Sequence, residues 1–368
     1  MLEAVKSQFK TARHAEARAV RGRLVAELVA GAWRGSAPAN SVEQLADISN
    51  LVLRSGAGGL AWCKIRGSDI RTHPIAEGFH AAYRLQSLQA ALHARSLKHV
   101  IPFLRSEGVE PLLVKGWAAA RLYPEPGMRP YCDLDLCVLP DHYAKASVAL
   151  KGVEGLGTNV DLHFGFGKFY DRRTDAIFAR SRLVKLDDIE VRVLCDEDNL
   201  RYLCMHLLRH GAVRPLWLCD IAVALESRTN EFDWDRCLAG SRREADWVAC
   251  AIGLASLLLG VDIEGTPIAH QAMRLPSWLV KAVLRDWGTP VRSPRQLYAM
   301  LRQPSRLLAE LPEELLSHWP NPIEATMTLR GPLNWVPRLP FQIGHVVSRS
   351  VALVSELIWT SRAIQHRS

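Results

Sequence analysis

The sequence predicts an α+β fold, with a small mixed β-sheet set between N- and C-terminal helical regions. Helical periodicity fills residues 1–107 and returns over residues 196–368. The middle stretch, residues 108–195, instead carries short apolar runs typical of strands, and residues 183–194 alternate around an Asp-Asp turn as a β-hairpin does. These observations divide the chain into an N-terminal helical region, an α/β core and a C-terminal helical region.

Composition indicates a globular protein with a sizeable core. Of the 368 residues 48% are hydrophobic, which is enough for two or three packed units. The net charge of +8 is compatible with RNA or another polyanionic partner, although the basic residues are spread along the sequence. The eight cysteines contain no Cys-x-x-Cys pair, so we expect reduced thiols in a cytoplasmic protein.

The sequence also predicts no membrane span. Met1–Val20 is rich in charged residues and lacks the apolar stretch of a secretory signal. Phe341–Ile364 is the most apolar long stretch, but Arg349, Glu356 and Arg362 interrupt it. We therefore expect an amphipathic helix packed on the protein, with contact to a membrane surface as the alternative.

Two carboxylates one residue apart stand out in the predicted core. Asp133 and Asp135 lie in a strand-like run, and side chains two apart on a strand share a face, about 6.6 Å apart. The apolar residues that alternate with them would face the other way and fix the register: Leu134, Leu136 and Val138. Because two like charges held this close repel, the pattern favours a divalent cation between them. A solvated strand edge is the alternative explanation.

A third carboxylate follows on the next predicted strand. Residues 159–164 alternate apolar and polar, with Asp161 and His163 on the polar face. If this strand pairs beside the first, about 4.8 Å away, Asp161 completes a three-carboxylate cluster. The alternative is a lone polar residue at the end of a strand. His163 would either orient Asp161 or serve as an ordinary structural histidine.

Cationic residues flank this acidic cluster. Residues 109–115 form a strand-like run that stops at Gly116, and residues 117–123 have helical composition. A strand–glycine–helix junction leaves backbone N–H groups free to bind an anion. Lys115 lies at the junction and Arg129 just before the carboxylates, so together they suggest a nucleoside triphosphate with its Mg²⁺. Each cation taken alone is better explained as an ordinary surface charge.

These motifs, in this order, resemble the nucleotidyltransferase superfamily, and specifically its uncharacterised bacterial nucleotidyltransferase-like branch. The matching elements share their order along the chain with that branch: Lys115-Gly116, Tyr123-Pro124, Arg129-Pro130, Asp133-Leu134-Asp135 and Asp161-Leu162-His163. The resemblance covers Leu112–Phe164 at the level of motifs and runs more loosely to about Asp262. One departure is the pair Gly116-Trp117, where the wider superfamily has Gly-Gly or Gly-Ser.

The resemblance implies magnesium-dependent transfer of a nucleoside monophosphate from a triphosphate to an acceptor, with release of pyrophosphate. Two Mg²⁺ ions would lie about 3.5–4 Å apart, with Mn²⁺ as an alternative. Asp133 and Asp135 would share the metals, and Asp161 would hold the second metal and accept the proton of the acceptor hydroxyl. The acceptor could be a small molecule, a peptide or protein, or an RNA.

The same resemblance assigns the phosphate-binding residues. Lys115, the backbone of Gly116 and Arg129 would neutralise the β- and γ-phosphates. The alternative function is a degenerate protein that binds a nucleotide or a partner without turnover, which Trp117 favours and the three carboxylates oppose. A metal-dependent phosphoesterase is the least favoured hypothesis.

Three further patterns have simpler structural explanations. Gly56–Gly59 lacks the Lys-Ser/Thr of a phosphate loop, so it predicts a turn between helices. His206 and His210 have the spacing of metal ligands on a helix but no third ligand nearby. Asp220 lies in an apolar run, so we expect it to pair with an arginine or a histidine, with a role at the base or the acceptor as the alternative.

Overall fold

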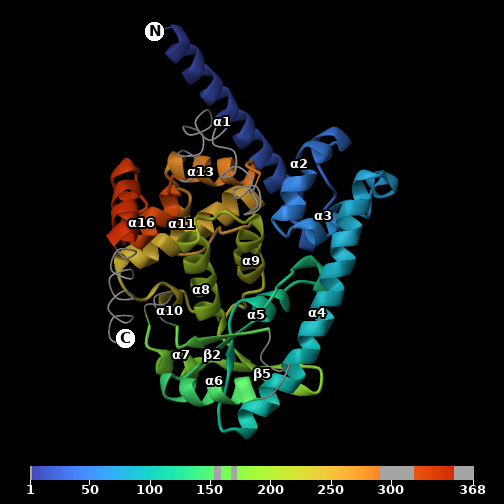
Figure 1. Cartoon of the computed structure of the whole chain (residues 1–368), viewed down its shortest axis with the longest axis vertical. Helices are drawn as coiled ribbons and strands as arrows, with labels where there is room; N and C mark the ends of the chain where they lie inside the picture. The colour runs from blue at the N-terminus through green and yellow to red at the C-terminus, as the bar shows by residue number, and fades with distance from the viewer. Residues whose placement is uncertain (1, 153–158, 167–171, 291–318, 352–368) are drawn as a thin grey trace, which may run out of the picture.

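A small β-sheet and a larger helical body make up the protein (Figure 1). The computed structural model describes residues 2–152, 159–166, 172–290 and 319–351. The sheet lies at one end, and helices from both halves of the chain lie above it. The predicted α+β fold with a small mixed sheet is therefore confirmed.

The sheet has five strands in the order β3-β2-β1-β5-β4. Their bounds are β1 Leu112–Leu113, β2 Leu134–Val138, β3 Val160–Phe164, β4 Arg182–Leu186 and β5 Ile189–Val193. β2 runs parallel to β3 and antiparallel to β1, while β5 runs parallel to β1 and antiparallel to β4. The mixed pairing and the β4–β5 hairpin agree with the sequence-based expectation.

Helices surround this sheet and build the rest of the described chain. Their bounds are α1 Leu2–Val29, α2 Val42–Arg54, α3 Gly58–Ile65, α4 Ile75–Ser106, α5 Gly116–Ala120, α6 Tyr143–Gly152, α7 Thr174–Arg180, α8 Asp196–Arg209, α9 Pro215–Glu226, α10 Trp234–Leu238, α11 Arg242–Leu259, α12 Ala269–Ala272, α13 Ser277–Trp287 and α16 Pro322–Thr328. Capping boxes begin α2 and α11, where Ser41 pairs with Gln44 and Ser241 with Glu244.

The helical body has one apolar core that both halves of the chain build. Buried side chains of α1–α3 pack with those of α8, α9, α11 and α13 in a single cluster. The sheet has a cluster on each face, one under α4 and α6 and the other under α7 and α8. The division of the chain at residues 107 and 195 stays a prediction, since the N- and C-terminal helices share a core.

Helix α4 connects the helical body to the sheet. It is 32 residues long, so it extends about 48 Å at 1.5 Å per residue. Phe79 near its start packs in the helical core, whereas Leu97 and Leu104 pack against the sheet. Figure 1 shows α4 running along one side of the molecule from the upper helices to the strands. This one helix fixes the sheet relative to the body.

The glycine-rich stretch after α2 serves packing. Gly56 has a φ of 86° in the turn between α2 and α3, and Gly59 lies inside α3. The N–H of Gly59 donates to Gln86 Oε1 at 3.1 Å. A Cβ at Gly59 would lie 1.9 Å from the carbonyl oxygen of Gly127, so only glycine fits there. The expected turn between helices is observed at Gly56, whereas Gly58 and Gly59 belong to α3.

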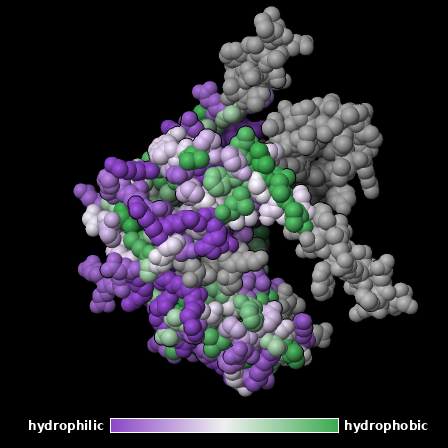
Figure 2. Space-filling view, turned by 90° about the vertical axis from the view of Figure 1, so that its left-hand side faces the viewer, coloured by the Kyte–Doolittle hydropathy of each residue, from purple (hydrophilic) through white to green (hydrophobic). Residues whose placement is uncertain are grey.

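The last described segment, residues 339–351, is helical and forms part of the predicted amphipathic helix. The rest of Phe341–Ile364 lies outside the described residues. His345 is buried, but many apolar side chains near this end are exposed: Trp335, Val336, Leu339, Ile343, Val346, Val347 and Val351. Figure 2 shows apolar side chains gathered beside grey residues on a face that is otherwise mostly polar. Among the described residues, no helix is long and apolar enough to cross a membrane.

Replacing Gly59 by alanine should destabilise the protein by about 1–3 kcal/mol, because the added methyl group collides with backbone that cannot move aside. Gly67→Ala is the matched control, since a Cβ at Gly67 meets nothing within 4 Å. Urea unfolding of the two variants measures the difference. Equal stability of both would contradict the packing explanation.

Candidate metal and nucleotide site

The sheet brings Asp135 and Asp161 side by side. β2, α6 and β3 form a parallel β-α-β unit in which these two residues are direct partners across the strands. On the other face of β2, Leu134, Leu136 and Val138 are buried in the cluster under α4 and α6. The apolar face therefore fixes the register, and the register aligns the two carboxylates.

Asp135 is a buried carboxylate with two nitrogen partners, the Lys115 ammonium and the His163 imidazole. It is only 4% exposed. Lys115 Nζ lies 2.7 Å and His163 Nε2 lies 3.0 Å from its Oδ1 atom. Burial by itself raises the pKa of Asp135, but the hydrogen bond from His163 and the charge of Lys115 outweigh burial and lower it. Asp135 is therefore held in its ionised form.

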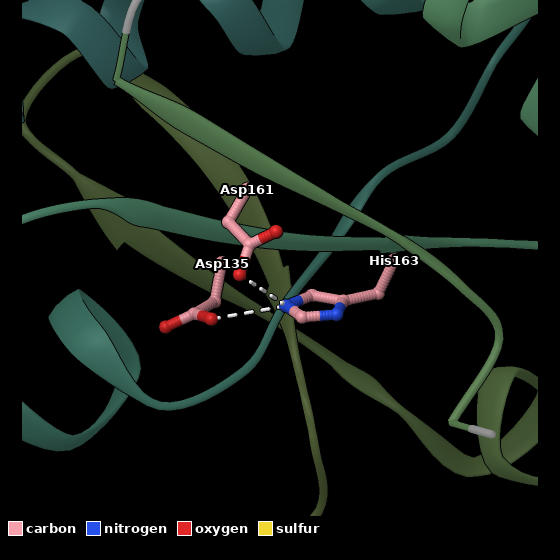
Figure 3. Close-up of side chains that lie close together, drawn as sticks. All are labelled: Asp135, Asp161 and His163. Carbon is pink, nitrogen blue, oxygen red and sulfur yellow. Dashed lines mark hydrogen bonds and ion pairs between the residues drawn. The ribbon is translucent and has the colours of Figure 1, made fainter. Parts of the chain in front are cut away.

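His163 bridges the two carboxylates. Its Nε2 atom also lies 3.2 Å from Asp161 Oδ2, and Figure 3 shows the imidazole pointing at both acidic side chains. One ligand atom from each of these three residues lies within 4.8 Å of the others, so the group could hold a metal ion. Two carboxylates and an imidazole are common metal ligands, and the donor set fits a divalent cation.

Asp133 lies close to this group but not within it. It occupies a bend directly before β2, which begins at Leu134 rather than earlier as the sequence suggested. Burial and then the charge of Asp135 raise the pKa of Asp133, while Lys115 lowers it and Asp161 raises it. All three predicted carboxylates thus interact electrostatically, although the metal-compatible group found in the described residues contains Asp135, Asp161 and His163.

The backbone at the β1–α5 junction directs Lys115 at Asp135. Lys115 has a φ of 51° and a ψ of −146°, a conformation that non-glycine residues rarely adopt. Such strain is often found at functional sites. Gly116 follows with a φ of 38°, and a Cβ there would lie 3.3 Å from the backbone oxygen of Asp133. The junction therefore requires a glycine beside the carboxylates.

The predicted phosphate-binding junction is short. α5 has five residues rather than the seven expected, so its helix dipole is small. Trp117, the departure from the superfamily pair, packs against the cluster on the opposite face of the sheet. Binding of phosphate by Gly116 stays a prediction.

Arg129 forms an ion pair with a buried carboxylate from another part of the chain. Its guanidinium donates to both oxygens of Asp220 on α9, at 2.7 and 3.0 Å, and to the carbonyl oxygen of Pro130. Tyr123 donates to the same carboxylate at 2.9 Å. Asp220 thus pairs with an arginine, as expected, and two of the motif residues hold α9 against the site loops. Phosphate binding by Arg129 stays a prediction.

Helix α8 lies over the acidic face of the sheet. Its N-terminal turn pairs with arginines from the α7–β4 segment, including Arg180 with Asp198 and Arg182 with Asp196. Burial and then the charges of Asp135, Cys137 and Asp161 raise the pKa of Tyr202 on α8. The sequence analysis missed Tyr202, because nothing local links an α8 residue to strands near position 135.

His206 and His210 form an aromatic cluster with Trp217. The ring centroids of the two histidines lie 4.5 Å apart, and each lies about 5 Å from that of Trp217. The metal-compatible group in the described part of the chain does not include them. Their i, i+4 spacing therefore serves packing beside the site.

Comparison with known proteins identifies the family. A family described as an uncharacterised nucleotidyltransferase matches residues 41–155 and 152–259, more than half of the chain. The chain belongs to this family. The resemblance drawn from the motifs is therefore confirmed, and it supports nucleotidyl transfer as the general activity. The comparison with curated proteins gave no match, nor did the comparison with solved structures.

The protein should lose stability in acid through His206. Burial first, and then His210 and Lys115, lowers the pKa of His206 from 6.5 to about 3. Between these values the unfolded chain binds a proton that the folded protein does not, so stability falls as the pH falls through this window, by up to about 1.4 kcal/mol per pH unit. Urea unfolding measured at several pH values across this window should show that the free energy of unfolding depends less steeply on pH in His206→Gln than in the wild type. His270 is exposed, and His270→Gln should keep the wild-type dependence of the free energy of unfolding on pH.

Removing Asp220 should destabilise the protein by about 3–5 kcal/mol, because Asp220→Ala leaves the buried Arg129 guanidinium without its partner. Replacing both residues, with Arg129→Met and Asp220→Leu, should recover much of this loss. Urea unfolding measures stability, and nucleotide affinity is measured on the folded double variant. Retained affinity would assign Arg129 to structure, and lost affinity would assign it to phosphate.

Proposed function

We propose that this protein is a magnesium-dependent nucleotidyltransferase that transfers a nucleoside monophosphate from a nucleoside triphosphate to an acceptor and releases pyrophosphate. The observation that carries the proposal is the direct cross-strand pairing of Asp135 with Asp161, beside Asp133, in a chain of the nucleotidyltransferase family. Pairing across adjacent strands brings together acidic groups from distant sequence positions. The alternative explanation, a solvated strand edge, gives no reason for carboxylates of two strands to meet.

Asp133, Asp135 and Asp161 are the residues that would hold the metal. Asp135 is 4% exposed and is kept ionised beside Lys115, so it offers a fixed anionic ligand next to Asp161. Two Mg²⁺ ions would stabilise the attacking and leaving oxygens of an in-line displacement at phosphorus. Asp133, in its bend at the start of β2, supplies the additional carboxylate that a second ion needs.

Lys115 neutralises the triphosphate. Its side chain is 19% exposed and reaches the acidic cluster from the strained β1–α5 junction, so its charge lies where phosphate oxygens must approach. The glycine at position 116 allows backbone to come close to the same place. Binding of the anion then depends on a fixed positive charge rather than on the dipole of the short α5.

Asp161 accepts the proton of the acceptor hydroxyl. Its side chain is 51% exposed, in contrast to the 5% of Asp135, so an incoming acceptor and a departing proton can reach it. The acceptor is a small molecule, a peptide or protein, or an RNA, and the net charge of +8 is compatible with the last of these. A nucleotide-binding protein without turnover is the second candidate, which Trp117 at the motif position favours.

The test is pyrophosphate release from each nucleoside triphosphate with Mg²⁺, with and without cell extract or total RNA. We expect release from the wild type and none from Asp135→Asn, because the buried member of the pair is lost. Asp161→Asn should abolish turnover and keep part of the nucleotide affinity, since Lys115 is unchanged. Asp187→Asn, in the exposed β4–β5 turn, is the control and should behave as wild type.

Other outcomes discriminate between the candidates. Saturable nucleotide binding by the wild type with no pyrophosphate under any condition would favour the binding protein without turnover. Pyrophosphate release that survives both Asp135→Asn and Asp161→Asn would refute the proposed site.

A further inference from the structure

The site differs from one built of carboxylates alone because the imidazole of His163 lies among its possible metal ligands. His163 lies two residues after Asp161 on β3, so both side chains share a face of the sheet. Its Nε2 atom lies 3.0 Å from Asp135 Oδ1 and 3.2 Å from Asp161 Oδ2. A nitrogen and two oxygens from two strands therefore converge on one point (Figure 3).

A hydrogen bond from His163 Nε2 cannot fully satisfy the oxygens of both Asp135 and Asp161. A neutral imidazole carries one N–H, so Nε2 can donate to one carboxylate well or to two poorly. In the other tautomer the proton is on Nδ1, and the Nε2 lone pair and the two carboxylate oxygens could then contact one cation. The side chains of His163 and Asp161 are 31% and 51% exposed, so an ion can enter from solvent. The third donor of the group is His163 and not Asp133.

We propose that His163 is a metal ligand together with Asp135 and Asp161, and that this mixed set prefers Mn²⁺ to Mg²⁺. The inference rests on the proposed function, since it specifies one ion position of the same site. Mg²⁺ strongly prefers oxygen ligands and gives up its waters reluctantly. An imidazole nitrogen suits a transition ion better than Mg²⁺, and Mn²⁺ is the transition ion that shares the preference of Mg²⁺ for carboxylate ligands.

The test is pulsed electron paramagnetic resonance of Mn²⁺ bound to the full-length protein. The probe is Mn²⁺ with inorganic tripolyphosphate, which occupies the phosphate site and contributes no base nitrogen. We expect the wild type to show echo-envelope modulation from a directly bound nitrogen. His163→Gln should lose this modulation and bind Mn²⁺ about tenfold more weakly, while its Mg²⁺ affinity, measured by competition, changes little.

Two controls make the result specific. His99→Gln changes an exposed histidine on α4, which packs on the opposite face of the sheet, and should leave both the modulation and the Mn²⁺ affinity unchanged. Thermal unfolding of His163→Gln should show a single cooperative transition above the temperature of the binding experiments, so that weaker ion binding is not a consequence of misfolding.

Failure of this inference differs from failure of the proposed function. Mn²⁺ bound to the wild type without nitrogen modulation, or modulation unchanged in His163→Gln, would overturn the role of His163 and leave the carboxylate site intact. Equal affinity of the wild type for Mn²⁺ and Mg²⁺ would overturn the preference. Ion binding that survives Asp135→Asn and Asp161→Asn would instead refute the site itself.

Discussion

The structure depends on keeping the Asp135 carboxylate ionised inside the fold. A buried charge without partners would cost several kcal/mol. Here Lys115 approaches from a strained turn and His163 from the neighbouring strand, and both contact the same carboxylate oxygen. The sheet register, the glycine at position 116 and the unusual backbone of Lys115 all serve this arrangement. The positive charge of Lys115 suits the phosphate binding that we propose for this site.

The two faces of the sheet have different roles. One face is apolar and packs under α4 and α6, which supplies the free energy that holds the strands in register. The other face carries Asp135 and Asp161, beside a smaller apolar cluster to which α7 and α8 contribute Ile177 and Tyr202. Because α4 enters both the helical core and the sheet cluster, the site is tied to the helical body. Helices from the later part of the chain can therefore complete a site whose acidic residues lie between positions 133 and 161.

Local patterns predicted most of the sheet but not the partners of its charges. Alternation identified the acidic and apolar faces of β2 and β3, because side chains on a strand alternate regardless of context. By the same reasoning Lys115 and Arg129 looked equivalent, as two cations flanking an acidic pair. The structure distinguishes them: Lys115 contacts Asp135, whereas Arg129 contacts Asp220, which lies 91 residues further along the chain. No periodicity encodes such a pairing.

The sequence by itself determined the fold class, the family, and the sharing of one strand face by Asp161 and His163, since these follow from composition, motif order and backbone geometry. Only the tertiary structure decided that β2 and β3 pair with Asp135 opposite Asp161, that His163 bridges them, and that Tyr202 of α8 lies near them. Those features depend on which surfaces pack together in space. Packing is a property of the whole chain, so a local pattern can suggest it but cannot fix it.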